Sequence, residues 1–235
     1  MSLSKDDALI IVDVQKDFCQ GGALPVPEGD QVVPVLNEYM KLFKKANGKT
    51  FATRDWHPPN HISFKAQGGP WSPHCIQNTQ GAQFHPDLKL TEDTYIISKA
   101  MDSSKEGYSG FDGTSLEAEL RDRGVKRVFV GGLATDYCVK NTVLDAIERG
   151  FETIVLSDAT KGINARPDDS EKAVFAMTAK GAETAVLKDF PEPAKIPSEK
   201  MPVEKIDEIS FTKAERKKKA RLRSRGPYRK TRIEH

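Results

Sequence analysis

The chain has 235 residues, enough for one large domain or two small ones. No apolar run approaches the ~20 residues that cross a membrane, and the N-terminus lacks the apolar core of a signal peptide, so we expect no membrane contact. Three cysteines in a chain of this length argue against a disulfide scaffold, so we expect a reducing, cytoplasmic setting. The net charge of +2 hides a basic end, because residues 211–235 hold eleven Lys and Arg against two Asp and Glu.

Short apolar runs alternate with amphipathic segments over residues 8–187. The first run is continuously apolar, which is typical of a strand buried on both faces. The expected strands are Ala8–Val14, Thr50–Thr53, Thr94–Ser98, Arg127–Gly132, Thr153–Ser157 (ending in Asp158) and Glu183–Leu187. The expected helices are Gly29–Asn47, Ser115–Arg123, Cys138–Arg149 and Pro167–Lys180. This alternation predicts a Rossmann-like α/β fold of three layers, αβα, around a mostly parallel six-stranded sheet.

Composition changes after Phe190, so residues 1–190 are expected to form one domain and residues 191–235 a linker with a basic tail. Such a tail is usually solvated and partly disordered, although a short helix over 212–223 is also consistent with its sequence. Its positive charge could contact nucleic-acid phosphates, but Tyr228 is the single aromatic residue after Phe211, which leaves little for base stacking.

Three chemically useful side chains follow apolar strands. Asp13 closes the first run, Lys99 follows the third, and Cys138 lies in the turn after the fourth. Thr135 is a good N-cap, which would place Cys138 in the first turn of a helix, where its pKa can fall. Because the carboxyl ends of parallel strands share one edge, the three can form a nucleophile with a base and an electrostatic partner. The alternative is three unrelated, solvated side chains.

The long segment 54–86 has no sustained periodicity and holds four of the five histidines. Asp55 and His57 lie two residues apart, so on extended backbone both point the same way. His74, 17 residues on, would complete a three-ligand metal site with open positions, and His61 lies between them. Such ligands suit Zn, Fe or Mn. Surface histidines in a polar loop are the alternative.

Aromatic residues lie beside these motifs and could form the walls of a pocket for a flat aromatic substrate. They are Phe18, Trp71, Tyr108 and Tyr137. Ordinary hydrophobic packing is the better explanation for each of them when it is taken alone.

Six segments, in this order, resemble the nicotinamidases, the metal-dependent branch of the isochorismatase-like cysteine hydrolases. They are Ile11–Phe18, Asp55–Phe64, Gly69–His74, Ser98–Lys99, Tyr108–Gly113 and Gly132–Cys138, and the likeness covers roughly residues 7–190. The resemblance implies hydrolysis of nicotinamide to nicotinic acid and ammonia in NAD salvage, with pyrazinamide usually accepted as well.

The resemblance also implies roles for individual residues. Asp13, Lys99 and Cys138 would be catalytic, and Phe18, Trp71, Tyr108 and Tyr137 would bind the substrate. The metal, most often zinc, would be held by Asp55, His57 and His74, with His61 as a fourth ligand or behind the ligands. A cis peptide at Leu133–Ala134 would aim the Ala134 and Cys138 N–H groups into one oxyanion hole.

Two other functions compete with this interpretation. Another amidase of the same family is the nearer one, although those branches generally lack the Asp-x-His metal set found at Asp55 and His57. A nucleic-acid-binding protein acting through residues 211–235 is the alternative from a different class. The sequence leaves open whether the chain forms a homo-oligomer.

Overall fold

The computed structural model describes residues 1–190, and the predicted linker and basic tail, with the helix considered over 212–223, lie outside the described residues. Six strands form one sheet in the order β3-β2-β1-β4-β5-β6, and every neighbouring pair is parallel. The strands are β1 Asp7–Val12, β2 Lys49–Asp55, β3 Tyr95–Lys99, β4 Arg127–Leu133, β5 Glu152–Lys161 and β6 Glu183–Ala185. The expected α/β fold with a six-stranded sheet is confirmed.

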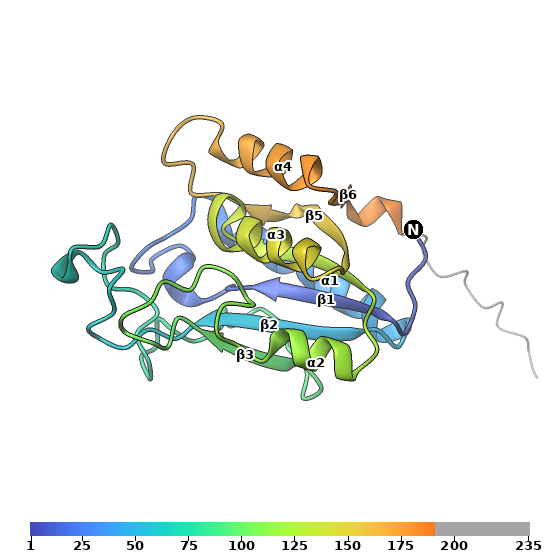
Figure 1. The fold of residues 1–235 in the computed structure, drawn as a ribbon, viewed down its shortest axis with the longest axis horizontal. Coiled ribbons are helices and arrows are strands. Elements are labelled where there is room, and N and C mark those ends of the chain that lie inside the picture. Colours follow the sequence, from blue (N-terminus) through green and yellow to red (C-terminus); the bar gives the residue numbers. More distant parts are fainter. Residues whose placement is uncertain (191–235) are drawn as a thin grey trace, which may run out of the picture. The chain divides into compact units, whose positions relative to one another are not determined.

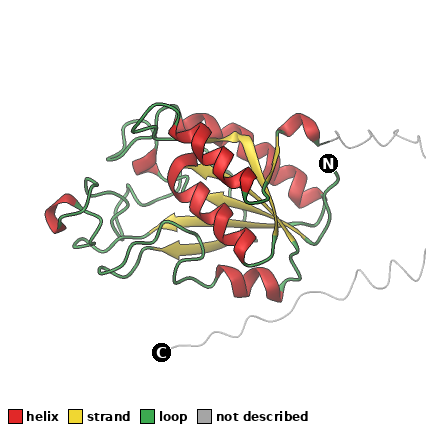
Figure 2. Cartoon of the chain, turned by 45° about the horizontal axis from the view of Figure 1, so that its top comes forward, coloured by secondary structure: helices red, strands yellow, loops and turns green. Residues whose placement is uncertain are grey.

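Helices cover both faces of this sheet, as Figures 1 and 2 show. The helices are α1 Val32–Lys45, α2 Leu116–Asp122, α3 Lys140–Glu148 and α4 Asp169–Ala179. Alternate residues of β1 point to opposite faces: Leu9 and Ile11 pack in the cluster that contains the buried face of α1, whereas Ile10 packs with side chains from the other three helices. The strand is therefore buried on both sides, which explains its continuous apolar sequence. Within residues 1–190 no helix is both long and apolar enough to cross a membrane.

The fifth strand is longer than expected. β5 continues through Asp158 to Lys161, and its pairing with β4 shifts register between Val130 and Gly132. A carboxylate within a strand is tolerated here because the Asp158 oxygens accept hydrogen bonds from the Tyr39 hydroxyl at 2.9 Å and from the Leu187 N–H at 2.7 Å.

The entry to α3 also differs from the expectation. Residues Thr135–Val139 form one turn of π-helix, and α3 begins only at Lys140. Thr135 makes no side-chain cap, because its hydroxyl pairs with that of Thr160 at 2.8 Å. The prediction of Thr135 as N-cap of an α-helix that contains Cys138 was therefore wrong, and Cys138 lies in the π-turn, a feature often found at functional sites.

The carboxyl ends of the central strands meet at one end of the sheet, which lies at the left in Figure 1. Asp55 and Lys99 are the last residues of β2 and β3 and are direct register partners. β1 and β4 approach closely at Gly132, whose φ is +121° and where a Cβ would overlap the backbone of Val12. Side chains that follow these four strands are thereby brought to one place.

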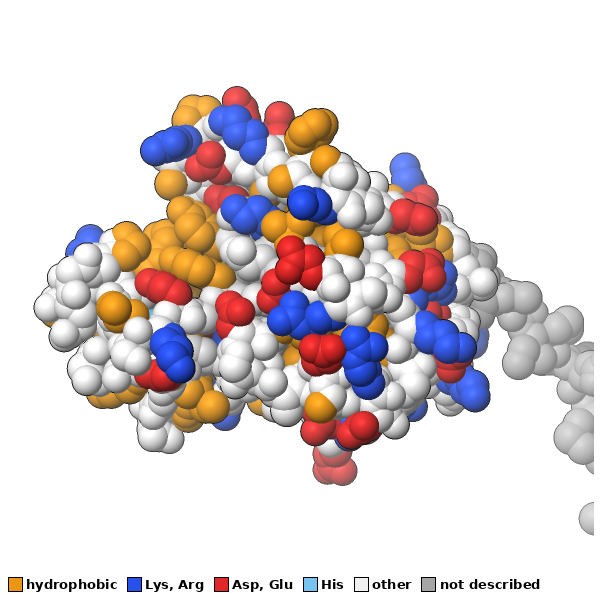
Figure 3. Space-filling model, viewed as in Figure 1, with side chains coloured by type: hydrophobic (Ala, Val, Ile, Leu, Met, Phe, Trp, Pro, Cys, Tyr) orange, Lys and Arg blue, Asp and Glu red, His pale blue; other side chains and the backbone are white. Residues whose placement is uncertain are grey.

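One face of the described residues is shown in Figure 3. Apolar side chains gather toward the left, where the carboxyl ends of the strands lie, while charges of both signs are interspersed over the rest of this face. Neither sign of charge predominates on this face, so it has no extended positive or negative surface that would attract a charged macromolecule.

Candidate active site

The strand-end residues Asp13, Lys99 and Cys138 lie in contact. The Lys99 Nζ is 2.9 Å from the Asp13 Oδ2 and 3.4 Å from the Cys138 Sγ. Asp13 has a φ of +50°, a left-handed conformation that is uncommon for a non-glycine residue and often found at functional sites. Asp13, Lys99 and Cys138 are almost fully buried. A carboxylate, an ammonium and a thiol thus share one dry site, the arrangement needed for nucleophilic catalysis.

Two further contacts fix the charges of this site. The Lys99 ammonium also contacts the Asp55 Oδ1 at 2.5 Å and donates to the Gly107 carbonyl at 3.0 Å. The Thr53 hydroxyl donates to the Asp13 Oδ1 at 2.6 Å. Burial lowers the pKa of Lys99, but the Asp13 and Asp55 carboxylates outweigh it and raise that pKa well above its usual value. The ammonium therefore stays charged between two carboxylates.

The protonation states of Asp13 and Cys138 follow from burial. Burial raises the pKa of Asp13 to about 6, although the Lys99 ammonium and the Thr53 hydroxyl both oppose that rise. Burial also raises the pKa of the Cys138 thiol well above its usual value, with Lys99 again opposing. The low thiol pKa expected at a helix start is thus not found, because Cys138 lies in a dry π-turn. A neutral thiol needs a base, and Asp13 is placed to serve.

Asp55, His57 and His74 form a second buried group, and one donor atom from each lies within 4.8 Å of the others. The His57 Nδ1 donates to the His74 carbonyl at 3.1 Å, and the His74 Nδ1 donates to the Ser72 carbonyl at 2.7 Å. Both Nε2 lone pairs are therefore free, and such hydrogen bonds orient histidine ligands. Burial lowers the pKa of His57 to about 4, which keeps the ring neutral, as ligation requires. This donor set fits a divalent metal ion.

His61 is placed differently. Its Nε2 donates to the Lys105 carbonyl at 2.9 Å, and its Nδ1 pairs with the Ser63 hydroxyl at 2.7 Å. Its ring stands edge-on to that of His57, with centroids 4.5 Å apart. Neither nitrogen is available to a metal without breaking one of these bonds, so in this structure His61 packs against His57 and does not point a free nitrogen at the Asp55–His57–His74 group.

A pocket opens above both groups. All four aromatic residues singled out in the sequence line it, together with Ala134 and Cys138. Trp71 and Tyr137 lie edge to face with centroids 5.1 Å apart, and the Trp71 indole N–H donates to the Tyr108 hydroxyl at 2.9 Å. These rings form a fixed apolar wall above the thiol, suited to a flat ring. The Leu133–Ala134 peptide bond beside them is cis.

Other residues of the site were not singled out in the sequence. The buried Gln15 side chain accepts a hydrogen bond from the Asp55 N–H at 2.7 Å and donates to the Asp55 carbonyl at 2.8 Å, which fixes this residue from both sides. Leu24, Val26 and Ile163 add apolar lining to the pocket. The strand-to-loop position of Gln15, directly after Asp13 and Val14, was a usable signal, whereas isolated aliphatic residues in loops carry none.

The parallel α/β fold, with a carboxylate, an ammonium and a thiol buried at the carboxyl end of its sheet, is consistent with a hydrolase. Residues 7–189 match the isochorismatase domain. The chain is 40% identical to the nicotinamidase of Escherichia coli K12 over 206 residues, covering 79% of this chain and 97% of that protein. It is 41% identical to the nicotinamidase/pyrazinamidase of Mycobacterium tuberculosis over 164 residues, covering 67% of this chain and 88% of the relative. The chain belongs to the isochorismatase family.

A solved structure is similar over the same region. The pyrazinamidase of Pyrococcus horikoshii in complex with zinc is 54% identical, superposes with a TM-score of 0.74, and covers 77% of this chain and 99% of its own. That relative binds zinc, which agrees with the donor set of Asp55, His57 and His74.

Proposed function

We propose that this chain hydrolyses nicotinamide to nicotinate and ammonia, and pyrazinamide likewise, as its nicotinamidase and pyrazinamidase relatives are named to do. The observation that carries the proposal is a buried thiol with its own acid–base partner, placed at the floor of an aromatic pocket and beside a metal-ligand group. The nicotinate produced would re-enter NAD synthesis, which makes the reaction a salvage step.

The pocket accounts for recognition of an aromatic amide. Phe18, Trp71, Tyr108 and Tyr137 would enclose the pyridine ring and leave its carboxamide directed at the Cys138 sulfur. Aromatic walls of this kind contribute apolar contact with little loss of side-chain freedom. Asp55, His57 and His74 line the same pocket beside the thiol.

Asp13 would start the reaction as a general base. It accepts the thiol proton of Cys138, and the sulfur forms a bond to the amide carbon. The backbone N–H groups of Ala134 and Cys138 would hold the oxyanion that develops. Throughout this step the positive charge of the Lys99 ammonium stabilises the Asp13 carboxylate and the thiolate that forms on Cys138.

The intermediate would then break down in two stages. The C–N bond breaks as Asp13 returns its proton to the leaving nitrogen, so ammonia departs and the acyl group remains on Cys138 as a thioester. Water then attacks the thioester while Asp13 takes one of its protons. The C–S bond breaks, nicotinic acid leaves and loses its remaining proton to solvent as nicotinate, and the proton on Asp13 returns to the Cys138 sulfur.

Asp55, His57 and His74 would hold zinc, with iron or manganese as alternatives from the same donor chemistry. When bound, such an ion supplies a Lewis-acid position for the pyridine nitrogen of the substrate and for water. The protein's part is to keep the His57 ring neutral and to orient both imidazole rings through the His74 and Ser72 carbonyls.

A panel of amides tests the function. We expect ammonia release from nicotinamide and pyrazinamide by the full chain, measured in a coupled assay, and far less from linear amides and carbamoyl compounds, which cannot fill the aromatic pocket. A preference for a linear or carbamoyl substrate would instead make the chain another amidase of its family.

Replacing Thr53 by valine should move the acid limb of the pH profile. The wild-type carboxylate of Asp13 must be ionised to act as a base, so kcat/KM should fall as the pH drops through its pKa of about 6. Removing the Thr53 hydroxyl, which stabilises that carboxylate, raises the pKa of Asp13. Activity should therefore be lost at a higher pH in Thr53→Val, as measured by kcat/KM between pH 5 and 9.

Thr153→Val is the matched control, because Thr153 is also a buried strand threonine but its hydroxyl donates to the Phe151 carbonyl. Its profile should follow the wild type. An acid limb that stays in place in Thr53→Val would show that Asp13 is not the base that sets it.

A further inference from the structure

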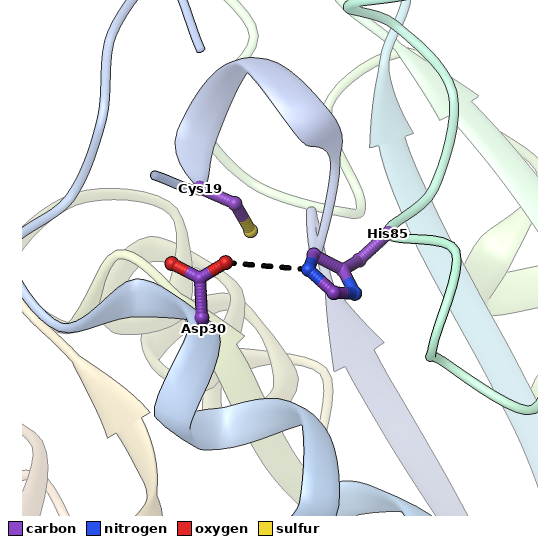
Figure 4. Close-up of side chains that lie close together, drawn as sticks. All are labelled: Cys19, Asp30 and His85. Carbon is purple, nitrogen blue, oxygen red and sulfur yellow. Dashed lines mark ion pairs between the residues drawn. The ribbon is translucent and has the colours of Figure 1, made fainter. Parts of the chain in front are cut away.

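A second group of metal-ligating side chains lies outside the active site. Cys19, Asp30 and His85 place one donor atom each within 4.8 Å of one another, and Figure 4 shows their side chains converging. Cys19 follows the short 3₁₀ turn Lys16–Phe18, and Asp30 belongs to the turn Gly29–Gln31 that precedes α1. None of the three residues lines the pocket of Cys138, and the mechanism above uses none of them.

The chemistry of these donors is that of a transition-metal site. A thiol, an imidazole and a carboxylate are the three ligand types that bind Zn²⁺ in proteins. The His85 Nε2 is already 3.2 Å from the Asp30 Oδ1. Tetrahedral zinc separates its ligand atoms by about 3.3–3.8 Å, so a modest inward movement of the sulfur would complete the geometry.

The three side chains are buried to different extents, so one side of the group is open to solvent. Cys19 is 2% exposed, whereas the side chains of His85 and Asp30 are 15% and 40% exposed. An ion held here would therefore have the protein on one side and water on the other. Three protein ligands with a solvent position is a common coordination for zinc.

The backbone around the three residues is already ordered. The Gln20 N–H donates to the Asp30 Oδ2 at 2.9 Å, and the His85 N–H donates to the Val14 carbonyl at 2.9 Å. A bound ion would thus order little additional chain, which limits the entropy cost of ligation.

We propose that Cys19, Asp30 and His85 form a second binding site for a divalent transition-metal ion, with Zn²⁺ as the best fit to the donors. On binding, the Cys19 thiol loses its proton to solvent and its sulfur bonds to the ion. The His85 Nε2 proton moves, through solvent, to the Nδ1. The Asp87 N–H, which in the metal-free site donates to that Nδ1 at 3.2 Å, then donates to water instead.

The site would act on one wall of the catalytic pocket. Residues 19–30 carry Leu24 and Val26, which line that pocket, and Phe18 directly precedes Cys19. An ion that joins Cys19 to Asp30 ties the two ends of this segment together. Zinc at this second site should therefore make the segment more resistant to proteolysis, without supplying a group to the reaction.

Zinc stoichiometry of the full chain tests the proposal. Metal-stripped protein is titrated with Zn²⁺ against a chromophoric chelator, and we expect Cys19→Ser and Asp30→Asn each to bind one equivalent fewer than the wild type. Asp87→Asn, a neighbouring carboxylate outside the group, should bind as many equivalents as the wild type. Unchanged stoichiometry in both Cys19→Ser and Asp30→Asn would overturn the site.

Cobalt spectra identify the sulfur ligand independently of activity. In a Cys138→Ala background, Cys19 and Cys75 are the remaining cysteines. Added Co²⁺ should give a near-ultraviolet thiolate charge-transfer band that Cys19→Ser removes and Cys75→Ser keeps. A band that survives Cys19→Ser, or no band at all, would contradict ligation by Cys19. Ammonia release, measured on chains with Cys138 intact, tests the proposed function separately.

Discussion

Replacing Cys138 by alanine is expected to lower ammonia release from nicotinamide by at least about 10⁴-fold, because it removes the sulfur that would form the bond to the amide carbon. The thiol lies on the floor of the pocket, 3.4 Å from the Lys99 ammonium. The aromatic walls do not depend on the sulfur, so nicotinamide should still bind. The rate is measured with the coupled assay and the binding by calorimetry.

Cys75→Ser is the control for this experiment, since Cys75 is equally buried but does not line the pocket. It should keep most of its activity. Substantial turnover by Cys138→Ala would end the assignment of Cys138 as nucleophile, whereas loss of both turnover and binding would point to a damaged fold.

Metal removal should have the second largest effect. Exhaustive chelation is expected to lower the rate by more than about 100-fold, and added Zn²⁺ should restore it. His57→Ala and His74→Ala should show the same loss without recovery, because each removes one of the three side chains whose donor atoms lie within 4.8 Å of one another. The readouts are ammonia release and bound zinc per chain.

His61→Ala separates a ligand from a supporting residue. Both nitrogens of His61 are bonded to protein atoms, so this variant should keep the metal at the first site and lose less activity than His57→Ala. Full activity of the wild type after complete chelation would remove the metal from the reaction. Loss of zinc from His61→Ala would make His61 a ligand.

The proximity of Asp13, Lys99 and Cys138 could be predicted from the sequence, because all strands of a parallel sheet have their carboxyl ends at the same edge. Each residue lies at the end of an apolar strand or in the turn after it, and the carboxyl ends of parallel strands share one edge. The pairing of Asp55 with His57 was readable for a similar reason, since side chains two apart on extended backbone point the same way.

Other properties of the site depend on tertiary structure and could not be read from the chain. Thr135 begins the π-turn that contains Cys138, and its hydroxyl pairs with that of Thr160, which is distant in sequence. The high pKa of the thiol reflects burial by the whole fold, which outweighs its position at the start of a helical segment. Neither the π-turn nor the raised thiol pKa can be predicted from the neighbouring sequence.

The direct pairing of Asp55 and Lys99 across β2 and β3 has a consequence for how the protein loses activity. Amide protons of central strands exchange with solvent only when a protein unfolds globally, whereas those of loops exchange through local opening. Asp55 is anchored in the internal strand β2, and its partner Lys99 lies on the edge strand β3 but is itself buried, whereas the pocket wall formed by Leu24 and Val26 lies in a loop. On gradual heating, the ability to discriminate between amide substrates should therefore be lost at a lower temperature than amide hydrolysis itself.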